Sequence, residues 1–334
     1  MSVSSLSVTS IILTLCVIYV NGLTDAPNSV ATCISTRALK PSLALPLSAI
    51  FNFLGVTVTC KVNNSVLNTI INMVALSDDT HENTVTLCAT LFTIVLWATV
   101  AWYFGIPTSE SHALIASLSG SAIALKGNLS GINPQEWTKA IYGLFLSCGI
   151  GLTGGLLVCK AVLFVFKNRN RQKANNIFTL WQIIASALLS FMHGAQDGQK
   201  FIALIVMCLS NSPIKSDINN YVVIICSVFM ALGTLTGGKR IIKSVGADML
   251  KVEKFQGFSA DLAASVSLLI STFLGYPVST THAKTTAVMG TGLAKNKSRI
   301  NFDKIKEIAL AWLLTFPGCS ILGFIITKIF LKIF

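Results

Sequence analysis

Two aspartates stand in matched settings and could hold a cation inside an otherwise apolar chain. Asp25 occurs in NGLTDAPNSVA at 21–31, and Asp197 occurs in HGAQDGQKFIA at 193–203. Each follows an apolar run, and a carboxylate in a hydrocarbon environment costs roughly 2.5–3.5 kcal/mol, so it calls for a partner or a role. Neutral oxygens nearby suit a hard cation such as Na⁺. These oxygens belong to Thr24, Asn28, Gln196 and Gln199, and we expect any Na⁺ at Asp25, Asn28, Asp197 and Gln199.

A second pair of segments supplies donors for an anion. GIPTSESHALIASLSGSAIA begins at Gly105, and GYPVSTTHAKTTAVMGTGLA begins at Gly275. In both, Gly-x-Pro breaks a helix, and the helix that restarts presents free N–H groups and partial positive charge to an anion. We expect the two helix tips to meet at a pseudo-two-fold axis around a small tetrahedral oxyanion. The expected contacts are Thr108, Ser109, Ser111, Ser279, Thr280 and Thr281, with Lys200 either approaching the anion or neutralising Asp197.

Plainer explanations exist for each of these features. Kinks rich in Ser and Thr ease helix packing in membranes, and an aspartate at the end of an apolar run can cap a helix at the membrane interface. His112 and His282 occupy matching positions, and we expect both to support the site through backbone hydrogen bonds rather than to touch the anion. The paired occurrence of both motifs favours a binding site.

The elements that must position these residues are membrane helices. The 334-residue chain is 53% hydrophobic and 11% charged, against roughly 25% charged residues in soluble domains. Several of its apolar runs approach the ~20 residues that span a bilayer. No basic residue precedes the first run, so we expect it to stay in the membrane rather than be removed as a signal peptide. The composition predicts an all-α, multi-pass protein of the cell membrane, with runs at 7–20, 43–60, 85–104, 140–166, 177–192, 221–235, 262–274 and 308–330.

The two motif pairs, 172 and 170 residues apart, indicate an internal duplication. We expect a first transmembrane repeat at 1–166, a basic cytoplasmic linker at 167–176 and a second repeat at 177–334. The connectors at 238–256 and 295–306 are rich in Lys and Arg, whereas their counterparts in the first half hold one lysine each. The positive-inside rule then puts matching loops on opposite faces. This predicts five crossings per half, both termini outside, and an inverted-topology repeat with two broken or re-entrant hairpins.

The net charge of +12 would suggest a nucleic-acid partner in a soluble protein. Here the basic residues cluster in connectors, so we expect contact with membrane lipid and no nucleic-acid partner. The nine cysteines are scattered without a CxxC pair, which is typical of small packing residues. Gly151 and Gly155 suit close contact between helices, and a homodimer interface is one place for it.

These motifs resemble those of the PiT family of inorganic phosphate transporters. HGAQDGQK, GYPVSTTHA, and GGKRIIKSVGADM followed by GFSADLAAS are similar to family sequences, and the resemblance covers essentially the whole chain. It implies uptake of inorganic phosphate with Na⁺ or H⁺ and no other cofactor. The sequence departs from the family at Thr24 and Gln196, where an Asn is expected before each aspartate. Fewer amide oxygens weaken the case for Na⁺, while Glu110, which stands where the second hairpin has Thr280, offers a proton site.

Other functions remain open at this stage. A sulfate permease of the same fold is the nearest, because the two anions share size and shape; only phosphate carries a proton to donate to an acceptor such as Asp25, Asp197 or Glu110. An intramembrane enzyme would use the aspartates as a catalytic dyad, but the chain shows no unique nucleophile. A channel would not need two anion tips together with buried acids. There is no GxxxxGK[ST] motif for ATP-driven pumping. We therefore expect a secondary active transporter rather than an enzyme.

Overall fold

The computed structural model describes residues 3–104, 108–209, 220–237, 252–295 and 301–334. In these residues the chain is helical, with one isolated β-bridge between Val74 and Ile132. The prediction of an all-α fold is confirmed. The first half contains α1 (Val3–Thr24), α2 (Asn28–Ser35), α3 (Pro41–Val62), α4 (Ser65–Ile71), α5 (Thr80–Phe104), α6 (Glu110–Lys126), the 3₁₀ turn η1 (Leu129–Gly131) and α7 (Pro134–Phe166). The second half contains α8 (Arg171–Leu209), α9 (Asn220–Thr236), α11 (Lys254–Phe273), α12 (Thr280–Lys295) and α13 (Phe302–Ile333).

The eight apolar runs lie in helices, as predicted, except that the last residue of the 262–274 run follows the end of α11. Six helical segments of the described residues are long and apolar enough to cross a membrane, and these lie in α1 with α2, α3, α5, α7, α8 and α13. Large apolar side chains such as Phe145, Leu157 and Leu313 are exposed on α7 and α13, as a surface in contact with lipid requires. Seven of the nine cysteines are buried as packing residues. The chain is a multi-pass membrane protein.

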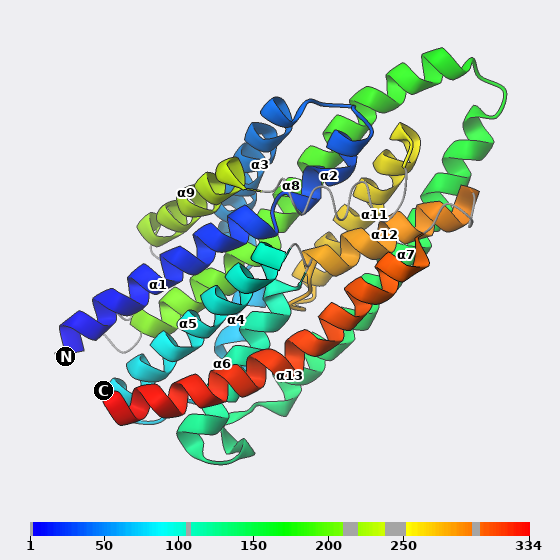
Figure 1. Cartoon of the computed structure of the whole chain (residues 1–334). Helices are drawn as coiled ribbons and strands as arrows, with labels where there is room; N and C mark the ends of the chain where they lie inside the picture. The colour runs from blue at the N-terminus through cyan, green and yellow to red at the C-terminus, as the bar shows by residue number, and fades with distance from the viewer. Residues whose placement is uncertain (1–2, 105–107, 210–219, 238–251, 296–300) are drawn as a thin grey trace.

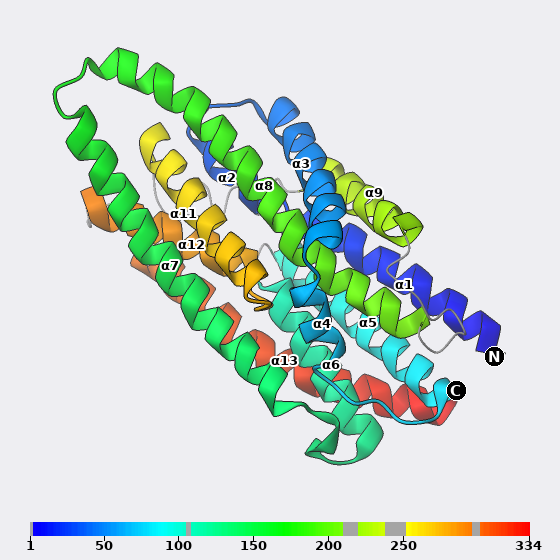
Figure 2. The same ribbon diagram turned by 180° about the vertical axis from the view of Figure 1, so that it is seen from behind.

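Helices of one half pack on helices of the other in a reciprocal pattern. α1 packs on α9 and α3 packs on α8, while α6 packs on α13 and α12 packs on α7. Within each half, α5 packs on α6 and α11 packs on α12. Figures 1 and 2 show α8 running the length of the molecule, with α3 and α9 to one side of it and α7, α11 and α12 to the other. Exchanging the halves turns each contact into its counterpart, the pattern that a duplication produces.

The glycines shared by the two repeats lie where helices from different halves cross. A Cβ atom at Gly22, Gly194, Gly120 or Gly290 would overlap a backbone carbonyl of the facing helix, far inside the 3.0 Å that real Cβ atoms keep. Only glycine allows the two backbones to approach this closely. The facing carbonyls belong to Met230, Asn52, Ser320 and Leu152, respectively.

Gly151 and Gly155 make the same kind of contact inside the chain. Their missing Cβ positions face the backbone of Ala283 and Ala287 in α12. The predicted close helix contact is therefore made within one molecule, and these glycines are covered by α12 rather than open to a second copy. The homodimer stays a prediction.

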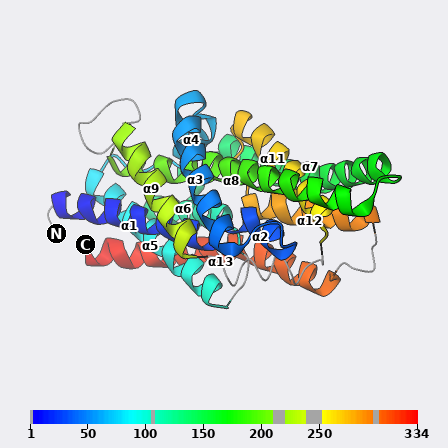
Figure 3. The same cartoon turned by 90° about the horizontal axis from the view of Figure 1, so that it is seen from above.

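Two connectors of the first half lie side by side. The connectors 61–83 and 127–139 touch, since Ala75 N–H donates to the Gly131 carbonyl (2.9 Å) and Asn133 N–H donates to the Met73 carbonyl (3.0 Å). In Figure 1 the start of α1 and the end of α13 lie near one another, opposite the α7–α8 turn. Figure 3 shows α1, α3 and α9 towards the end that holds the start of α1 and the end of α13. It shows α7, α11 and α12 towards the opposite end. The basic segments 238–251 and 296–300 lie outside the described residues.

Candidate functional site

The two hydroxyl-rich segments begin α6 and α12 in the same way. Ser109 Oγ accepts the backbone N–H of His112 (3.2 Å), and Ser279 Oγ accepts that of His282 (3.3 Å). A serine at this position caps the helix by satisfying one of its free N–H groups. The helix is broken between α11 and α12, as predicted, whereas Gly105 and Pro107 lie outside the described residues.

The first aspartate is held between α1, α2 and α12. Asp25 lies in the short break after α1, and its Oδ1 accepts hydrogen bonds from Asn28 Nδ2 (2.8 Å) and from Thr281 Oγ1. Its Oδ2 accepts one from Thr280 Oγ1 (3.4 Å), and Asn28 Nδ2 also reaches Thr281 Oγ1 (3.0 Å). All four side chains are buried. The structure therefore brings an expected cation ligand of the first half against expected anion contacts of the second.

The second aspartate forms the matching arrangement on α8. Lys200 Nζ donates to Asp197 Oδ1 (2.6 Å), Ser111 Oγ (2.6 Å) and the Val278 carbonyl (2.5 Å). An ammonium group has three N–H donors, and protein acceptors take all of them. Lys200 has no exposed surface. Two roles were expected for Lys200, approach to the anion or neutralisation of Asp197, and the structure contains the ion pair with Asp197.

His193 joins the two aspartates, and sequence reasoning missed it. One ligand atom from each of Asp25, His193 and Asp197 lies within 4.8 Å of the others. His193 Nε2 is 3.3 Å from Asp197 Oδ2, while its Nδ1 is 2.9 Å from Asn52 Oδ1. Asn21, the repeat counterpart of His193, donates to Asp197 Oδ2 (3.3 Å). The available signal was the helical spacing of four residues, which puts His193 and Asp197 on one face.

Glu110 adds a third buried carboxylate to this region. It is 2% exposed, and Thr24 Oγ1 donates to its Oε1. Among the described residues, three buried acceptors near Asp25 have no hydrogen-bond donor: Glu110 Oε2, Asn28 Oδ1 and Asn21 Oδ1. Three carboxylates accompany one ammonium, so the cluster is short of positive charge and of donors. Protons would supply both, and a metal cation would supply the charge and bind the unpaired oxygens directly.

Two of the expected cation ligands are bonded elsewhere. Gln196 Nε2 donates to the Tyr276 carbonyl (2.7 Å), and its Oε1 accepts from Thr272 Oγ1 (3.1 Å). Gln199 Oε1 accepts the Leu67 N–H (3.2 Å). These amides join α8 to the segments on either side of it, so their contribution to a cation site remains a prediction.

The paired histidines hold the two helix tips together. The rings of His112 and His282 meet edge to face with centroids 4.4 Å apart. His112 stacks on Phe316 at 4.4 Å, and His282 lies 3.6 Å from Trp312. Within the described residues, both ring nitrogens of His282 and Nδ1 of His112 make no hydrogen bond, so aromatic packing replaces the backbone bonds we expected at these atoms. The tips of α6 and α12 meet, as predicted, with Thr108 half-buried beside them.

A second buried charge cluster was not foreseen. Lys284 on α12 pairs with Asp261 on α11 and donates to Thr32 Oγ1 (2.8 Å). Ser186 Oγ donates to Asp261 Oδ2 (2.6 Å), and all four side chains are buried. The signal was present, because opposite charges inside apolar segments need each other. The pairing itself cannot be read from one sequence, since the two residues lie on separate helices.

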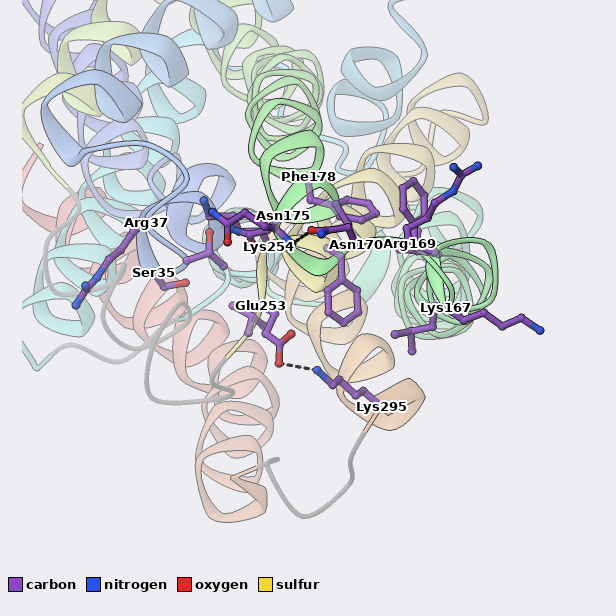
Figure 4. Close-up of a pocket in the computed structure, with 18 residues that line it drawn as sticks. Ser35, Arg37, Lys167, Arg169, Asn170, Asn175, Phe178, Glu253, Lys254 and Lys295 are labelled. Atoms are coloured by element: carbon purple, nitrogen blue, oxygen red, sulfur yellow. Dashed lines mark hydrogen bonds and ion pairs between the residues drawn. The ribbon is translucent and has the colours of Figure 1, made fainter.

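Polar side chains lead from Asp25 to a basic hollow. Asn28, Thr32 and Thr36 share one face at the spacing of four, and Thr36 Oγ1 donates to Gln182 Oε1 (2.8 Å). Thr36 lines a cavity of about 1210 Å³, which includes the 167–170 turn and the ends of α11 and α12. Figure 4 shows Glu253 and Lys295 facing one another there, 2.5 Å apart. Its other charged lining residues are Arg37, Lys167, Arg169 and Lys254.

Comparisons with known proteins agree with this arrangement. Residues 21–323 match the model of the phosphate transporter family. Over 335 residues the chain is 34% identical to a "Probable low-affinity inorganic phosphate transporter" of Bacillus subtilis (strain 168), covering 97% of this chain and 99% of the relative. A protein of the same name from Rhizobium meliloti (strain 1021) is 34% identical, with 91% and 90% covered.

A solved structure shares the fold. It is titled "The sodium-dependent phosphate transporter" and superposes with a TM-score of 0.81, over 98% of this chain and 99% of that one, at 20% identity. The relatives are named as transporters, so the chain is a membrane transporter and not an enzyme. From its repeated motifs, its helical architecture and the family match over most of its length, the chain belongs to the phosphate transporter family.

Proposed function

We propose that the protein imports inorganic phosphate across the cell membrane together with a cation, either Na⁺ or H⁺. The observation that carries the proposal is the buried cluster of three carboxylates with one ammonium, next to two helix starts. Carboxylates alone would repel an anion, and a cation between them removes the repulsion. The names of the relatives supply phosphate as the anion.

The anion is bound by the starts of α6 and α12. Their first-turn N–H groups and the six hydroxyl side chains predicted above surround it from opposite sides. Two of these hydroxyls, those of Ser109 and Ser279, cap the helices and fix the direction of the neighbouring N–H groups. The contact between His112 and His282 keeps the two starts together, and this supports a single shared site.

Coupling follows from a change of hydrogen-bond partner. In the structure, Thr280 and Thr281 donate to Asp25. A cation on Asp25 satisfies the carboxylate, which frees both hydroxyls to donate to phosphate. Each ligand therefore favours the other, because binding free energies are coupled reciprocally. Asn28 Oδ1, which has no hydrogen-bond donor among the described residues, supports a cation at this place.

The coupling ion has two candidate sites. Asp25 and Asn28 offer the oxygens that suit Na⁺. Glu110, with one oxygen unpaired among the described residues, offers a place for a proton. The proposal includes both Na⁺ and H⁺ as the coupling ion, and the experiments below distinguish Na⁺ coupling from H⁺ coupling.

Alternating access is proposed to use the two halves, 1–166 and 177–334, joined by the basic linker 167–176. The reciprocal packing of α1 on α9 with α3 on α8, and of α6 on α13 with α12 on α7, supports their equivalence. We propose that the halves are inverted in the membrane with both termini outside. Rocking of one half against the other would then expose the central site to each face in turn.

Sulfate is the competing substrate, and uptake in cells tests the choice. In cells that lack their own phosphate uptake, expression of the chain should restore accumulation of labelled phosphate. Excess unlabelled phosphate should compete, whereas sulfate should not, because buried acceptors are left unpaired by an anion without a proton. Asp25→Asn is the matched control and should abolish accumulation while the protein still reaches the membrane. Equal competition by sulfate would favour the permease for that anion.

A further inference from the structure

Two matched constellations in the site differ by one residue type. In the repeat alignment Asn28 corresponds to Lys200, each three residues after its aspartate. Likewise Ser111 of α6 corresponds to Thr281 of α12. Each aspartate therefore has two neighbours of matching origin. One lies three residues further along the chain, and the other is a hydroxyl residue near the start of α6 or α12 in the opposite half.

The two constellations share the placement of one nitrogen, although Thr281 Oγ1 also donates to Asp25 whereas Ser111 Oγ donates to the Val278 carbonyl (3.3 Å). Asn28 Nδ2 lies 2.8 Å from Asp25 Oδ1 and 3.0 Å from Thr281 Oγ1. Lys200 Nζ lies 2.6 Å from Asp197 Oδ1 and 2.6 Å from Ser111 Oγ. In both cases a nitrogen stands between a carboxylate and a hydroxyl. That nitrogen is neutral in the first half and positively charged in the second.

The charge difference decides which constellation can take a cation. Asp197 is already neutralised by an ammonium that has no exposed surface. Asp25 receives only neutral donors, and Asn28 Oδ1 is buried without a donor among the described residues. Rotation of the Asn28 amide would turn that oxygen towards the place its nitrogen now occupies, since the two ends of the amide have the same shape.

Lys200 is also poorly placed to hold the anion. Its third N–H donates to the Val278 carbonyl (2.5 Å), so no donor remains for a ligand. The counterpart of Val278 in the first half is Thr108, which precedes α6.

We propose that Lys200 is a tethered cation that permanently fills the second of two symmetric cation sites, so that transport uses one coupling cation fewer than a symmetric site would need. The inference rests on the proposed function, because it assigns the stoichiometry of that coupling. The remaining mobile cation binds at Asp25 with Asn28 and Thr281.

The test is the ion stoichiometry of Lys200→Asn. Purified protein in liposomes is given a fixed phosphate gradient, and the opposing Na⁺ or pH gradient that stops net phosphate flux is measured. Lys200→Asn rebuilds the second site with an amide, so it should carry one more cation per phosphate than the unsubstituted chain. The double variant Asp197→Asn/Lys200→Asn differs from it only in the carboxylate and should return to the original number.

Exchanging the residues at positions 28 and 200 gives a second test. Asn28→Lys/Lys200→Asn moves the ammonium to the first constellation, so one tethered and one mobile cation remain. We expect the stoichiometry of the unsubstituted chain, with the cation now dependent on Asp197. Loss of transport on adding Asp197→Asn to this variant, together with unchanged membrane insertion, would agree with the transfer.

Several outcomes would overturn the inference. Lys200→Asn could transport with the original stoichiometry, or it could weaken only the affinity for phosphate, which would make Lys200 an anion contact. If Lys200→Asn does not transport, the melting temperature of the purified protein is followed against Na⁺ concentration and pH; a dependence no steeper than that of the unsubstituted chain rejects the second site. By contrast, uptake by the unsubstituted chain that ignores both gradients rejects the proposed function itself.

Discussion

Asp25→Asn and Asp197→Asn should have different effects on stability, although the two residues are repeat counterparts. Asp197 is the charged partner of Lys200, whereas Asp25 accepts hydrogen bonds from neutral donors only. Asp197→Asn leaves a fully buried ammonium with neutral acceptors only, which are the amide oxygen of the new Asn, the Ser111 hydroxyl and the Val278 carbonyl. The same change at Asp25 removes an uncompensated charge and keeps an acceptor oxygen for the same donors.

The magnitudes follow from the two environments. Breaking a buried ion pair by removing one partner costs about 3–5 kcal/mol. At roughly 2 °C per kcal/mol for a chain of this size, Asp197→Asn should lower the melting temperature by about 6–10 °C. Asp25→Asn should stay within about 1 kcal/mol of the unsubstituted chain, a shift of roughly 2 °C or less, because no buried charge is left unpaired.

The assay is thermal unfolding of each purified variant in detergent at low Na⁺, followed by tryptophan fluorescence. Asp197→Asn/Lys200→Met is the control, since removing both charges should recover most of the lost stability. Equal losses for the two single variants, or no recovery in the double variant, would refute the asymmetric charge assignment. Both single variants should still lose gradient-driven uptake.

Three further predictions concern packing, coupling and the second charge cluster. Gly155→Ala should lower the yield of folded protein because its Cβ meets the α12 backbone, whereas Gly149→Ala on the same helix should be tolerated because it faces open space; detergent gel filtration distinguishes them. Glu110→Gln should abolish uptake driven by a pH gradient in liposomes if Glu110 carries the proton, and unchanged, strictly Na⁺-driven uptake would place the coupling cation at Asp25 instead. Lys284→Met should destabilise the protein by about 3–5 kcal/mol, and adding Asp261→Asn should restore much of it; melting temperatures that drop further in the double variant would contradict this.

Most of the fold follows from sequence, because membrane helices depend on local composition. The predicted apolar runs form helices. The shared Gly-x-Pro segments predict that a new helix starts after α5 and after α11, and α6 and α12 do so. The importance of the paired glycines could also be predicted, because a glycine that occurs at the same position in both repeats indicates the same structural role in each. Gly22 and Gly194 have one: each lets a helix approach a facing backbone.

The site is only partly predictable, because contacts between helices depend on how far each helix is rotated. The sequence predicts Asp25 and Asn28 as cation ligands and Thr281 as an anion contact, and the structure brings these three side chains together. It equally favoured Gln199, whose oxygen instead accepts the backbone N–H of Leu67. The Asp261–Lys284 pair requires knowledge of which helices are neighbours, and one sequence without relatives does not contain it.

The central claim is that phosphate moves inwards because a cation moves with it. The most direct measurement is the uptake of labelled phosphate into liposomes containing the purified chain, with Na⁺ and pH gradients imposed one at a time. The account predicts accumulation above the external concentration under at least one inward cation gradient, and none when Asp25 is replaced by Asn. Accumulation that needs neither gradient, or that Asp25→Asn leaves intact, would contradict it.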